Sequence, residues 1–297
     1  MGAKAPARLR TVGDWLNLTV ERFNKAGLYF GHGSANARDE AAYLMLHTLK
    51  LPLDELDSVL DRQLTPAEIE SLEGIVRRRI DERVPAAYLT REAWLGEFRF
   101  YIDERAIVPR SYIAPLLRDE LYPWVSEDQP INRALDLCTG SGCLAILLAH
   151  AFPGAEVDAT DLSAQALEVA ARNVADYGLQ DRVHLTQGDL FAGLTGRYDL
   201  IVSNPPYVNR ASMEDLPQEY RAEPPMALAG GEDGLAIVRR LLAHAGSHLN
   251  ERGILVVEIG HNRDVLEQAF PRVPFTWLAT SGGDDFVFLL TAAELHR

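Results

Sequence analysis

A glycine-rich turn with acidic residues placed around it is the first group that could do chemistry. The segment Asp136-Leu137-Cys138-Thr139-Gly140-Ser141-Gly142-Cys143 lies where an apolar run passes into a helical pattern, and such turns let the backbone approach a ligand. Asp161 follows Gly142 by nineteen residues, at the predicted end of the next strand, where a carboxylate can accept both hydroxyls of a ribose. The spacing predicts a ribonucleoside-containing cofactor, with an ordinary tight turn as the plainer alternative.

Two classes of cofactor fit this turn. Gly140 to Ala145 also matches the G-x-G-x-x-A pattern of NAD sites. An NAD site needs an exposed helix N-terminus for the pyrophosphate, and Asp136 would bring negative charge close to it. A cationic ligand such as S-adenosylmethionine tolerates that charge better. Asp189, at the predicted end of a third strand, can accept from an adenine amino group with Leu190 or Phe191 against the ring, although a helix N-cap explains Asp189 equally well.

The second chemical group is Asn204-Pro205-Pro206-Tyr207, directly after the apolar run 198–203. Two prolines fix the backbone and remove two N–H donors, so carbonyl groups remain free to accept. Together with the Asn204 side-chain oxygen they can hold both hydrogens of an NH₂ group, which is positioning combined with electrostatic preorganisation. Tyr207 can stack on a planar group or face a cation. A proline-rich turn without chemistry is the alternative.

The two motifs can form one site only if the strands that precede them end at the same edge of a sheet. From residue 132 onward, apolar strand-like runs alternate with helical patterns, which predicts a mostly parallel, doubly wound α/β sheet. The last two strands, joined by Ser281-Gly282-Gly283-Asp284-Asp285, read as a hairpin, so one strand should be antiparallel. The predicted strands are 134–138, 156–160, 183–187, 198–203, 253–259, 275–279 and 286–290, and the predicted helices are 142–152, 163–177 and 235–249.

The first 90 residues favour a small helical domain. Thr65, Pro66 and Glu68 form a capping-box pattern at the start of one helix, Gly27 is a plausible stop for another, and a third is expected over 37–49. Arg77-Arg78-Arg79 is expected on a solvated helix face. A period-two pattern broken at Gly96 predicts a hairpin or a bulge, and a linker is expected over 122–129.

Charge and cysteine content narrow the partners and the compartment. The 297 residues carry a formal net charge of −14, and residues 126–297 hold 12 basic and 24 acidic side chains. This argues against a protein that coats nucleic acid and favours a basic partner or a small ligand. Cys138 and Cys143 provide neither a disulfide framework nor a CxxC pair for zinc, which predicts a cytoplasmic protein without a metal.

The combination of the two motifs resembles the class I S-adenosylmethionine-dependent amino-methyltransferases. That resemblance implies that residues 138–142 wrap the methionine part of the cofactor, Asp161 holds the ribose, and Asp189 and Leu190 flank the adenine. It also implies that the segment 204–207 receives the target nitrogen. The candidate catalytic residues are Asn204, Pro205, Pro206 and Tyr207. The candidate cofactor residues are Asp136, Cys138, Thr139, Gly140, Ser141, Gly142, Asp161, Asp189, Leu190 and Asn204.

The N-terminal half is similar to the HemK/PrmC-like protein-glutamine methyltransferases. The residues that carry this are Tyr88-Leu89-Thr90, Glu92-Ala93-Trp94, Phe98, Phe100, Asp103-Glu104-Arg105 and Val108-Pro109-Arg110-Ser111. Release-factor enzymes continue after Pro-Arg with Pro-Glu-Thr-Glu, whereas this chain has Ser111-Tyr112-Ile113-Ala114. That continuation looks like the branch acting on the third protein of the large ribosomal subunit, although that branch usually has proline where this chain has Tyr112. Tyr29-Phe30-Gly31-His32-Gly33, Leu216-Pro217-Gln218-Glu219-Tyr220-Arg221 and Pro274-Phe275-Thr276-Trp277-Leu278 agree with it.

The sequence therefore predicts a helical substrate-recognition domain over 1–90, a hairpin and linker over 91–129, and a Rossmann-like methyltransferase domain over 130–297. The resemblance implies methyl transfer from S-adenosylmethionine to a glutamine amide nitrogen in a basic protein of the large ribosomal subunit. Neither a membrane nor duplex DNA is expected as a partner. The alternatives are a release-factor glutamine methyltransferase, a ribosomal-RNA or DNA amino-methyltransferase, an NAD-dependent oxidoreductase, and a ribosome-assembly protein that binds without catalysis.

Overall fold

The computed structural model describes residues 10–126 and 128–295. The chain forms two compact units. The first contains the residues up to Glu92 together with Pro217–Ala222, and the second contains Ala93–Leu216 and the chain from Glu223 onward. The stretch 91–129, expected as hairpin and linker, falls almost entirely within the second unit. A short piece of chain after the Asn-Pro-Pro-Tyr segment thus belongs to the helical unit.

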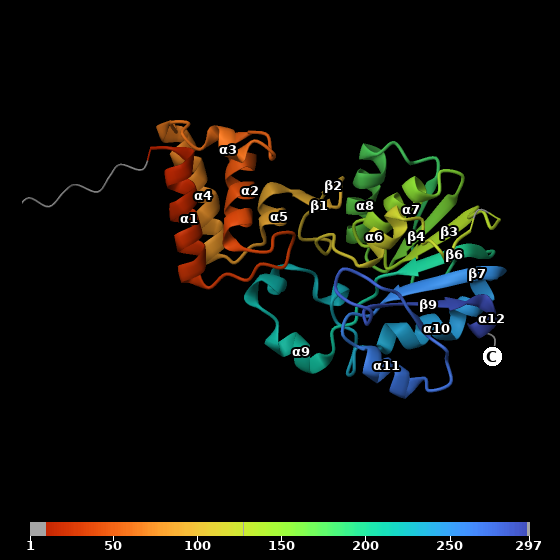
Figure 1. The fold of residues 1–297 in the computed structure, drawn as a ribbon. Coiled ribbons are helices and arrows are strands. Elements are labelled where there is room, and N and C mark those ends of the chain that lie inside the picture. Colours follow the sequence, from red (N-terminus) through yellow and green to blue (C-terminus); the bar gives the residue numbers. More distant parts are fainter. Residues whose placement is uncertain (1–9, 127, 296–297) are drawn as a thin grey trace, which may run out of the picture. The chain divides into compact units, whose positions relative to one another are not determined.

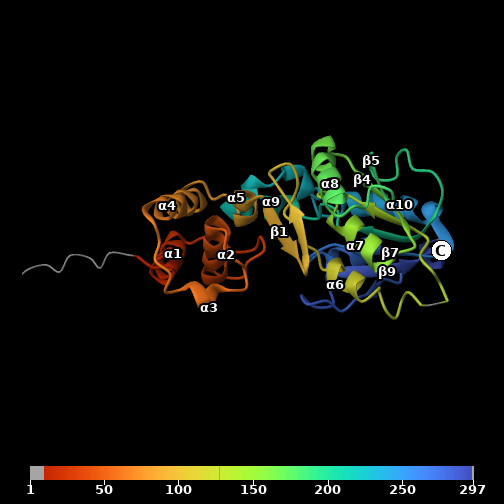
Figure 2. The same ribbon diagram turned by 90° about the horizontal axis from the view of Figure 1, so that it is seen from above.

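The first unit is a helical bundle. Figures 1 and 2 show three of its helices, α1, α2 and α4, lying side by side. Thr65 caps the helix that it precedes in a capping box with Glu68, and Gly27 ends the first helix in the left-handed conformation at φ 60°, as the sequence predicts. The helices are α1 (Val12–Ala26), α2 (Ala37–Leu49), α3 (Leu56–Val59), α4 (Pro66–Asp81) and α5 (Ala86–Thr90).

The prediction that Arg77, Arg78 and Arg79 lie on a solvated helix face is wrong for Arg79. Its side chain is buried, and its Nε donates to Glu40 Oε1 at 2.6 Å while Nη1 donates to Glu219 Oε1 at 3.2 Å. Arg77 and Arg78 are exposed, as expected. The helical period carries Arg79 to the inner side of α4, where the two carboxylates compensate its charge. Local charge content could not reveal this, because Glu219 lies 140 residues away in the chain.

A seven-stranded sheet forms the centre of the second unit. Its order is β5-β4-β3-β6-β7-β9-β8, and β9 runs antiparallel to both β7 and β8. This confirms the predicted mostly parallel Rossmann-like sheet with one antiparallel strand. The winding reverses between β3 and β6, the kind of switch point at which open α/β sheets bind ligands. The strands are β3 (Arg133–Leu137), β4 (Glu156–Asp161), β5 (Val183–Gln187), β6 (Tyr198–Ser203), β7 (Leu249–Glu258), β8 (Thr276–Trp277) and β9 (Val287–Thr291).

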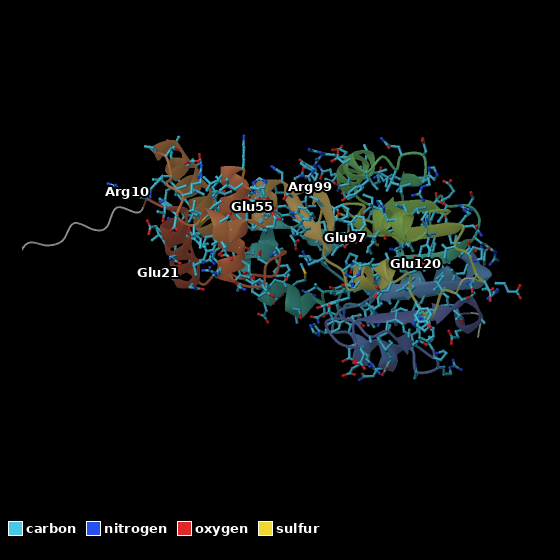
Figure 3. The ribbon with its side chains drawn as sticks, turned by 45° about the horizontal axis from the view of Figure 1, so that its top comes forward. Arg10, Glu21, Glu55, Glu97, Arg99 and Glu120 are labelled. Carbon is cyan, nitrogen blue, oxygen red and sulfur yellow. The ribbon has the colours of Figure 1, made fainter. Side chains whose placement is uncertain are left out.

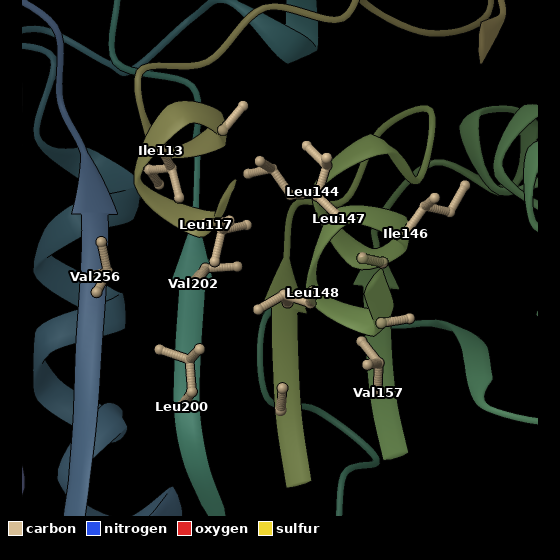
Figure 4. Packing of buried hydrophobic residues seen from close by; sticks show 14 of the residues in the cluster. Ile113, Leu117, Leu144, Ile146, Leu147, Leu148, Val157, Leu200, Val202 and Val256 are labelled. Atoms are coloured by element: carbon tan, nitrogen blue, oxygen red, sulfur yellow. The ribbon is translucent and has the colours of Figure 1, made fainter. Parts of the chain in front are cut away.

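Helices cover both faces of this sheet (Figure 1). On one face lie α6 (Ile113–Arg118), α7 (Cys143–Ala151) and α8 (Ala164–Asp176), and on the other lie α10 (Ala236–His248), α11 (Arg263–Ala269) and α12 (Ala292–Leu295). Leu200 and Val202 pack with the first set, as Figure 4 shows, whereas Ile201 packs with the second. The alternation follows from the period-two geometry of a strand, and it holds the loops at the strand ends on a rigid support.

Shorter elements complete the second unit. The predicted hairpin forms from β1 (Glu92–Leu95) and β2 (Phe98–Tyr101), with Gly96 at φ 62° in its turn. Three short elements between β6 and α10 were not predicted, because single turns carry too little periodicity. They are α9 (Arg210–Asp215), η1 (Gln218–Ala222), which belongs to the first unit, and η2 (Pro225–Ala227).

Charged side chains cover the outside of each unit. Figure 3 labels six of them, Arg10, Glu21, Glu55, Glu97, Arg99 and Glu120, and all six are exposed. Among the helices that the structure describes, none has the length and apolarity required to cross a bilayer.

Candidate active site

The turn after β3 is held in a conformation that glycine makes accessible. Gly140 and Gly142 have φ angles of 56° and 80°, and Cys138 between them and the strand has φ 61°. A Cβ on Gly142 would lie 3.1 Å from the Cβ of Ala170 on α8. The turn therefore brings backbone close to its neighbours and leads directly into α7, as a cofactor-binding turn requires.

Asp136 lies beneath this turn and is fully buried. Its Oδ2 accepts from the Thr139 hydroxyl and from the Ala145 N–H at 3.0 Å. Its Oδ1 has no hydrogen-bond partner among the described residues. Burial raises the pKa of Asp136 to about 7, although the Thr139 and Ala145 donors favour the carboxylate. Asp136 therefore holds the turn through Oδ2, and its Oδ1 is left for a donor that the described residues do not supply.

Asp161 ends β4 and contacts the same turn. Its Oδ2 accepts from the Gly140 N–H at 2.9 Å, and its Oδ1 accepts from the Ser163 N–H at 2.8 Å. Each carboxylate oxygen can accept more than one hydrogen bond, so both retain capacity for hydroxyl groups. Burial raises the pKa of Asp161, and the N–H groups of Ser163 and Gly140 oppose that rise. The structure therefore brings together the two groups that the spacing predicted to be neighbours.

Asp189 and Leu190 follow β5, the next strand along the same edge. The Asp189 side chain is about half exposed and pairs with Arg240 of α10 at 2.8 Å. Leu190 is buried with φ 55°, and its carbonyl oxygen accepts from the Thr160 hydroxyl at 3.1 Å. The motif lies at the expected strand end, while the partnership with Arg240 was not predicted because 51 residues separate the two.

We name residues 138–142, the candidate cofactor site, the cofactor turn. The segment 204–207 leaves the sheet beside it. In the register of β3 with β6, Leu137 lies opposite Ser203, and the Ser203 hydroxyl donates to the Leu137 carbonyl at 2.8 Å. Asn204 is partly exposed, and its Nδ2 donates to the carbonyl oxygen of Arg110 at 3.1 Å. We name residues 204–207 the acceptor corner. It occupies the strand end at the topological switch point.

Tyr207 is fixed from several directions. Its hydroxyl donates to Glu258 Oε1 at 3.3 Å, and its carbonyl oxygen accepts from Asn262 Nδ2 at 2.7 Å. A Cβ on Gly260 would lie 2.6 Å from the Tyr207 ring, so glycine is required at this contact. Burial raises the pKa of the Tyr207 phenol, and the neighbouring Glu258 carboxylate adds to the rise. The phenol therefore stays protonated near neutral pH and acts as a donor.

The supporting residues of the acceptor corner were only partly visible in the sequence. Arg110 belongs to the Val-Pro-Arg segment quoted for the family resemblance. Glu258 is the last residue of β7. Glu223, which binds the Arg110 guanidinium at 2.6 and 2.7 Å, and Asn262 carried no sequence signal of their own.

The residues of the turn fit S-adenosylmethionine. A buried carboxylate oxygen without a donor, such as Asp136 Oδ1, is costly unless a ligand or water supplies one. An ammonium or sulfonium ligand is compatible with the two acidic groups, whereas a pyrophosphate would be repelled by them. Among residues 10–126 and 128–295, no cluster of His, Cys, Asp or Glu could hold a metal ion.

Comparisons with known proteins identify the family. Residues 14–90 match the PrmC N-terminal domain model, and residues 123–219 match the Methyltransferase small domain model. The ribosomal protein uL3 glutamine methyltransferase of Neisseria meningitidis serogroup B is 59% identical over 292 residues, covering 98% of this chain and 96% of that protein. Proteins of the same name from Burkholderia pseudomallei and Bordetella pertussis are 55% and 56% identical, covering 98% and 97% of this chain and 97% of each relative. The chain belongs to the family of ribosomal protein uL3 glutamine methyltransferases.

Proposed function

We propose that this protein transfers a methyl group from S-adenosylmethionine to the side-chain amide nitrogen of a glutamine in ribosomal protein uL3. The observation that carries the proposal is the adjacency of two strand ends. The cofactor turn follows Leu137 and the acceptor corner follows Ser203, and these two residues lie opposite each other in the register of β3 with β6. The relatives that match over nearly the whole chain supply the identity of the acceptor.

The acceptor corner suits an amide NH₂ group. Because Asn204 Nδ2 is committed to the Arg110 carbonyl, its Oδ1 is the end of the side chain that can accept from a substrate. Pro205 and Pro206 have no N–H to compete for that substrate. Holding both hydrogens of the amide orients its nitrogen and favours rehybridisation of a lone pair that is otherwise delocalised. Tyr207, a neutral phenol, serves for stacking and orientation rather than as a base.

The cofactor residues have separate tasks in this proposal. Asp161 accepts from the ribose hydroxyls, the backbone of residues 138–142 surrounds the methionine part, and Asp189 with Leu190 borders the adenine. Asp136 supports the turn and offers Oδ1 toward a donor. When bound, S-adenosylmethionine supplies an electrophilic methyl group on a sulfonium. The two acidic groups of the turn make its surroundings favourable for positive charge.

The charge of the chain suits a basic protein acceptor in the cytoplasm. Residues 126–297 hold twice as many acidic as basic side chains, so they attract a basic ribosomal protein and repel a duplex backbone. A DNA enzyme would need a basic groove and a pocket for a flipped base. We assign recognition of the acceptor protein to the helical unit over residues 1–90, the part that matches the PrmC N-terminal domain model.

The test is methylation of defined acceptors with labelled S-adenosylmethionine, followed by mapping of the labelled residue. We expect label on one glutamine of uL3, and near-complete loss of label when that glutamine is replaced by asparagine, because the shorter side chain retracts the amide by one methylene group. Release factor, protein-free ribosomal RNA and duplex DNA are the competing acceptors. Efficient labelling of any of these with none on uL3 would overturn the proposal.

A further inference from the structure

We propose that Glu223 is a positioning residue for methyl transfer, which acts through Arg110 to fix the Asn204 side-chain amide with its oxygen toward the acceptor. The inference rests on the function proposed above and extends it to residues outside the Asn-Pro-Pro-Tyr motif. Glu223 and Arg110 are 113 residues apart in the chain, and both belong to the second unit.

The orientation of the Asn204 amide decides what it can offer a substrate. A side-chain amide has a donor end and an acceptor end of nearly equal shape. In this structure the donor end, Nδ2, points to the Arg110 carbonyl oxygen at 3.1 Å. The reverse orientation would place two acceptor oxygens against each other and would turn an NH₂ group toward the substrate NH₂. The Arg110 carbonyl therefore selects the productive orientation.

The position of that carbonyl is set by a buried carboxylate. Arg110 Nη1 and Nη2 donate to Glu223 Oε1 and Oε2 at 2.6 and 2.7 Å, a two-point contact that fixes both direction and distance. Glu223 Oε1 also accepts from the Val108 N–H at 3.0 Å. One buried side chain thus holds the backbone before Arg110 and the side chain of Arg110 itself.

The other end of the same backbone segment is held independently. Glu258, also buried, accepts from the Ser111 hydroxyl at 2.6 Å and from the Tyr112 N–H at 2.8 Å. The same carboxylate receives the Tyr207 hydroxyl. Residues 108–112 are therefore fixed at both ends, and each fixing carboxylate leads to a different residue of the acceptor corner. Loss of the Glu223 carboxylate leaves the hydrogen bond between Tyr207 and Glu258 in place. It should therefore change the position of the Asn204 side chain and not that of Tyr207.

The experiment is a double-mutant cycle on the full-length chain. Glu223→Gln, Asn204→Ala and the double variant are compared in single-turnover methylation of uL3, with cofactor affinity measured by calorimetry on each. We expect Glu223→Gln to lower the rate 10- to 100-fold, since small misplacement of a positioning group has effects of this size. Cofactor affinity should change less than threefold. In the Asn204→Ala background the same substitution should lower the rate less than twofold, because the amide that it positions is gone.

Asp158→Asn is the matched control. Asp158 Oδ2 accepts from Arg133 Nη2 and from the Tyr198 hydroxyl, both at 2.8 Å, and neither partner belongs to the two motifs. Its substitution should have the same small effect with and without Asn204. If Glu223→Gln is unfolded at the assay temperature, Arg110→Lys replaces it in the cycle, because lysine retains the charge but not the two-point contact.

Two results would overturn the inference. One is a rate loss on Glu223→Gln that is undiminished in the Asn204→Ala background, which indicates a structural role. The other is an unchanged rate in a folded Glu223→Gln variant. If the wild-type chain labels no glutamine of uL3, the proposed function fails first and the inference falls with it. If the wild type labels uL3 and the cycle shows no coupling, only the positioning role is lost.

Discussion

The cofactor turn and the acceptor corner leave neighbouring strands of one sheet, yet they are held in different ways. The hydrogen bonds of Thr139, Gly140 and Ser141 in the cofactor turn join residues 3 to 32 positions apart, as for Gly140 with Asp161 and Ser141 with Asn173. Those that fix the acceptor corner join residues 51 to 94 positions apart, as for Tyr207 with Glu258 and Asn204 with Arg110. One site is built locally, and the other is assembled from distant parts of the chain.

From this difference we expect substitutions at the two sites to affect different quantities, cofactor affinity at one and the rate of methyl transfer at the other. Glycine conformations and short-range bonds shape the cofactor turn, so damage there should reduce cofactor affinity. The acceptor corner owes its shape to buried side chains on other elements, so damage there should reduce the rate while the cofactor still binds. Substitutions at the two sites can test whether the separation holds.

The largest effect is expected at Asn204. In the proposed function Asn204→Ala removes one acceptor for the substrate amide, which should lower the single-turnover rate about 10²- to 10³-fold, roughly 3–4 kcal/mol in the barrier, as for loss of one preorganised hydrogen-bonding group. Asn204→Asp keeps an acceptor and adds a charge that favours positive nitrogen, but it loses the donor to the Arg110 carbonyl, so its rate should lie between those of Asn204→Ala and the wild type. A near-native rate for Asn204→Ala at saturating donor and acceptor would contradict the assignment of the acceptor corner to the methyl-transfer rate. So would a loss confined to cofactor affinity.

Asp161 should show the opposite pattern. If Asp161 accepts from the ribose as proposed, Asp161→Ala leaves the ribose hydroxyls without that acceptor and frees the Gly140 N–H, which should cost about 2–4 kcal/mol, or about 30- to 1000-fold in cofactor affinity. Calorimetry with S-adenosylmethionine measures this directly. Asp181→Ala, an exposed residue before β5, is the control and should bind normally. Equal affinity for the two variants would reject the assignment of Asp161.

Gly142→Ala tests the local packing of the cofactor turn. Alanine at φ 80° is strained, and its Cβ would lie 3.1 Å from Ala170, so the free energy of unfolding should fall by about 1–2 kcal/mol. Gly178→Ala has a similar φ of 65° but no atom within 4 Å of the added Cβ. Urea unfolding of both variants separates backbone strain from the contact. If the two lose the same stability, close approach to α8 is not what requires glycine at 142.

The smallest effect concerns Asp136 and depends on pH. Because its pKa is raised to about 7 from 3.8, the folded state retains a proton that the unfolded state has released between these values. The wild-type free energy of unfolding should therefore fall as pH rises through this window. Asp136→Asn removes that dependence. The free energy of unfolding of the variant, relative to that of the wild type, should therefore rise by about 1 kcal/mol per pH unit between pH 5 and 6.

Asp233→Asn provides the control for that measurement. Its hydrogen bond with Arg239 lowers the pKa of Asp233 to about 2, so the stability it contributes is present throughout pH 5–7 and is lost only in acid. Urea unfolding at pH 5, 6 and 7 should give a constant difference from wild type for Asp233→Asn. A constant difference for Asp136→Asn as well would show that its carboxyl is already ionised at pH 5.

Much of the fold followed from local patterns. The strands 183–187 and 198–203 have the predicted bounds, and so does α2 over Ala37–Leu49. Apolar runs bounded by turn residues fix such elements regardless of what lies beyond them. The prediction of a solvated Arg79 was wrong, since its partner Glu219 lies 140 residues away. The short helices between β6 and α10 were not predicted, because single turns carry too little periodicity.

The residue types at the strand ends can be read from the sequence, and the alternation of strands and helices predicts the edge of the sheet at which they lie. This is possible because strand direction and glycine conformation are short-range properties. The hydrogen bonds between Asn204 and the Arg110 carbonyl, between Arg110 and Glu223, and between Tyr207 and Glu258 form only when the chain is folded. Those contacts depend on how separate elements pack, and side-chain burial rather than sequence spacing selects the partners.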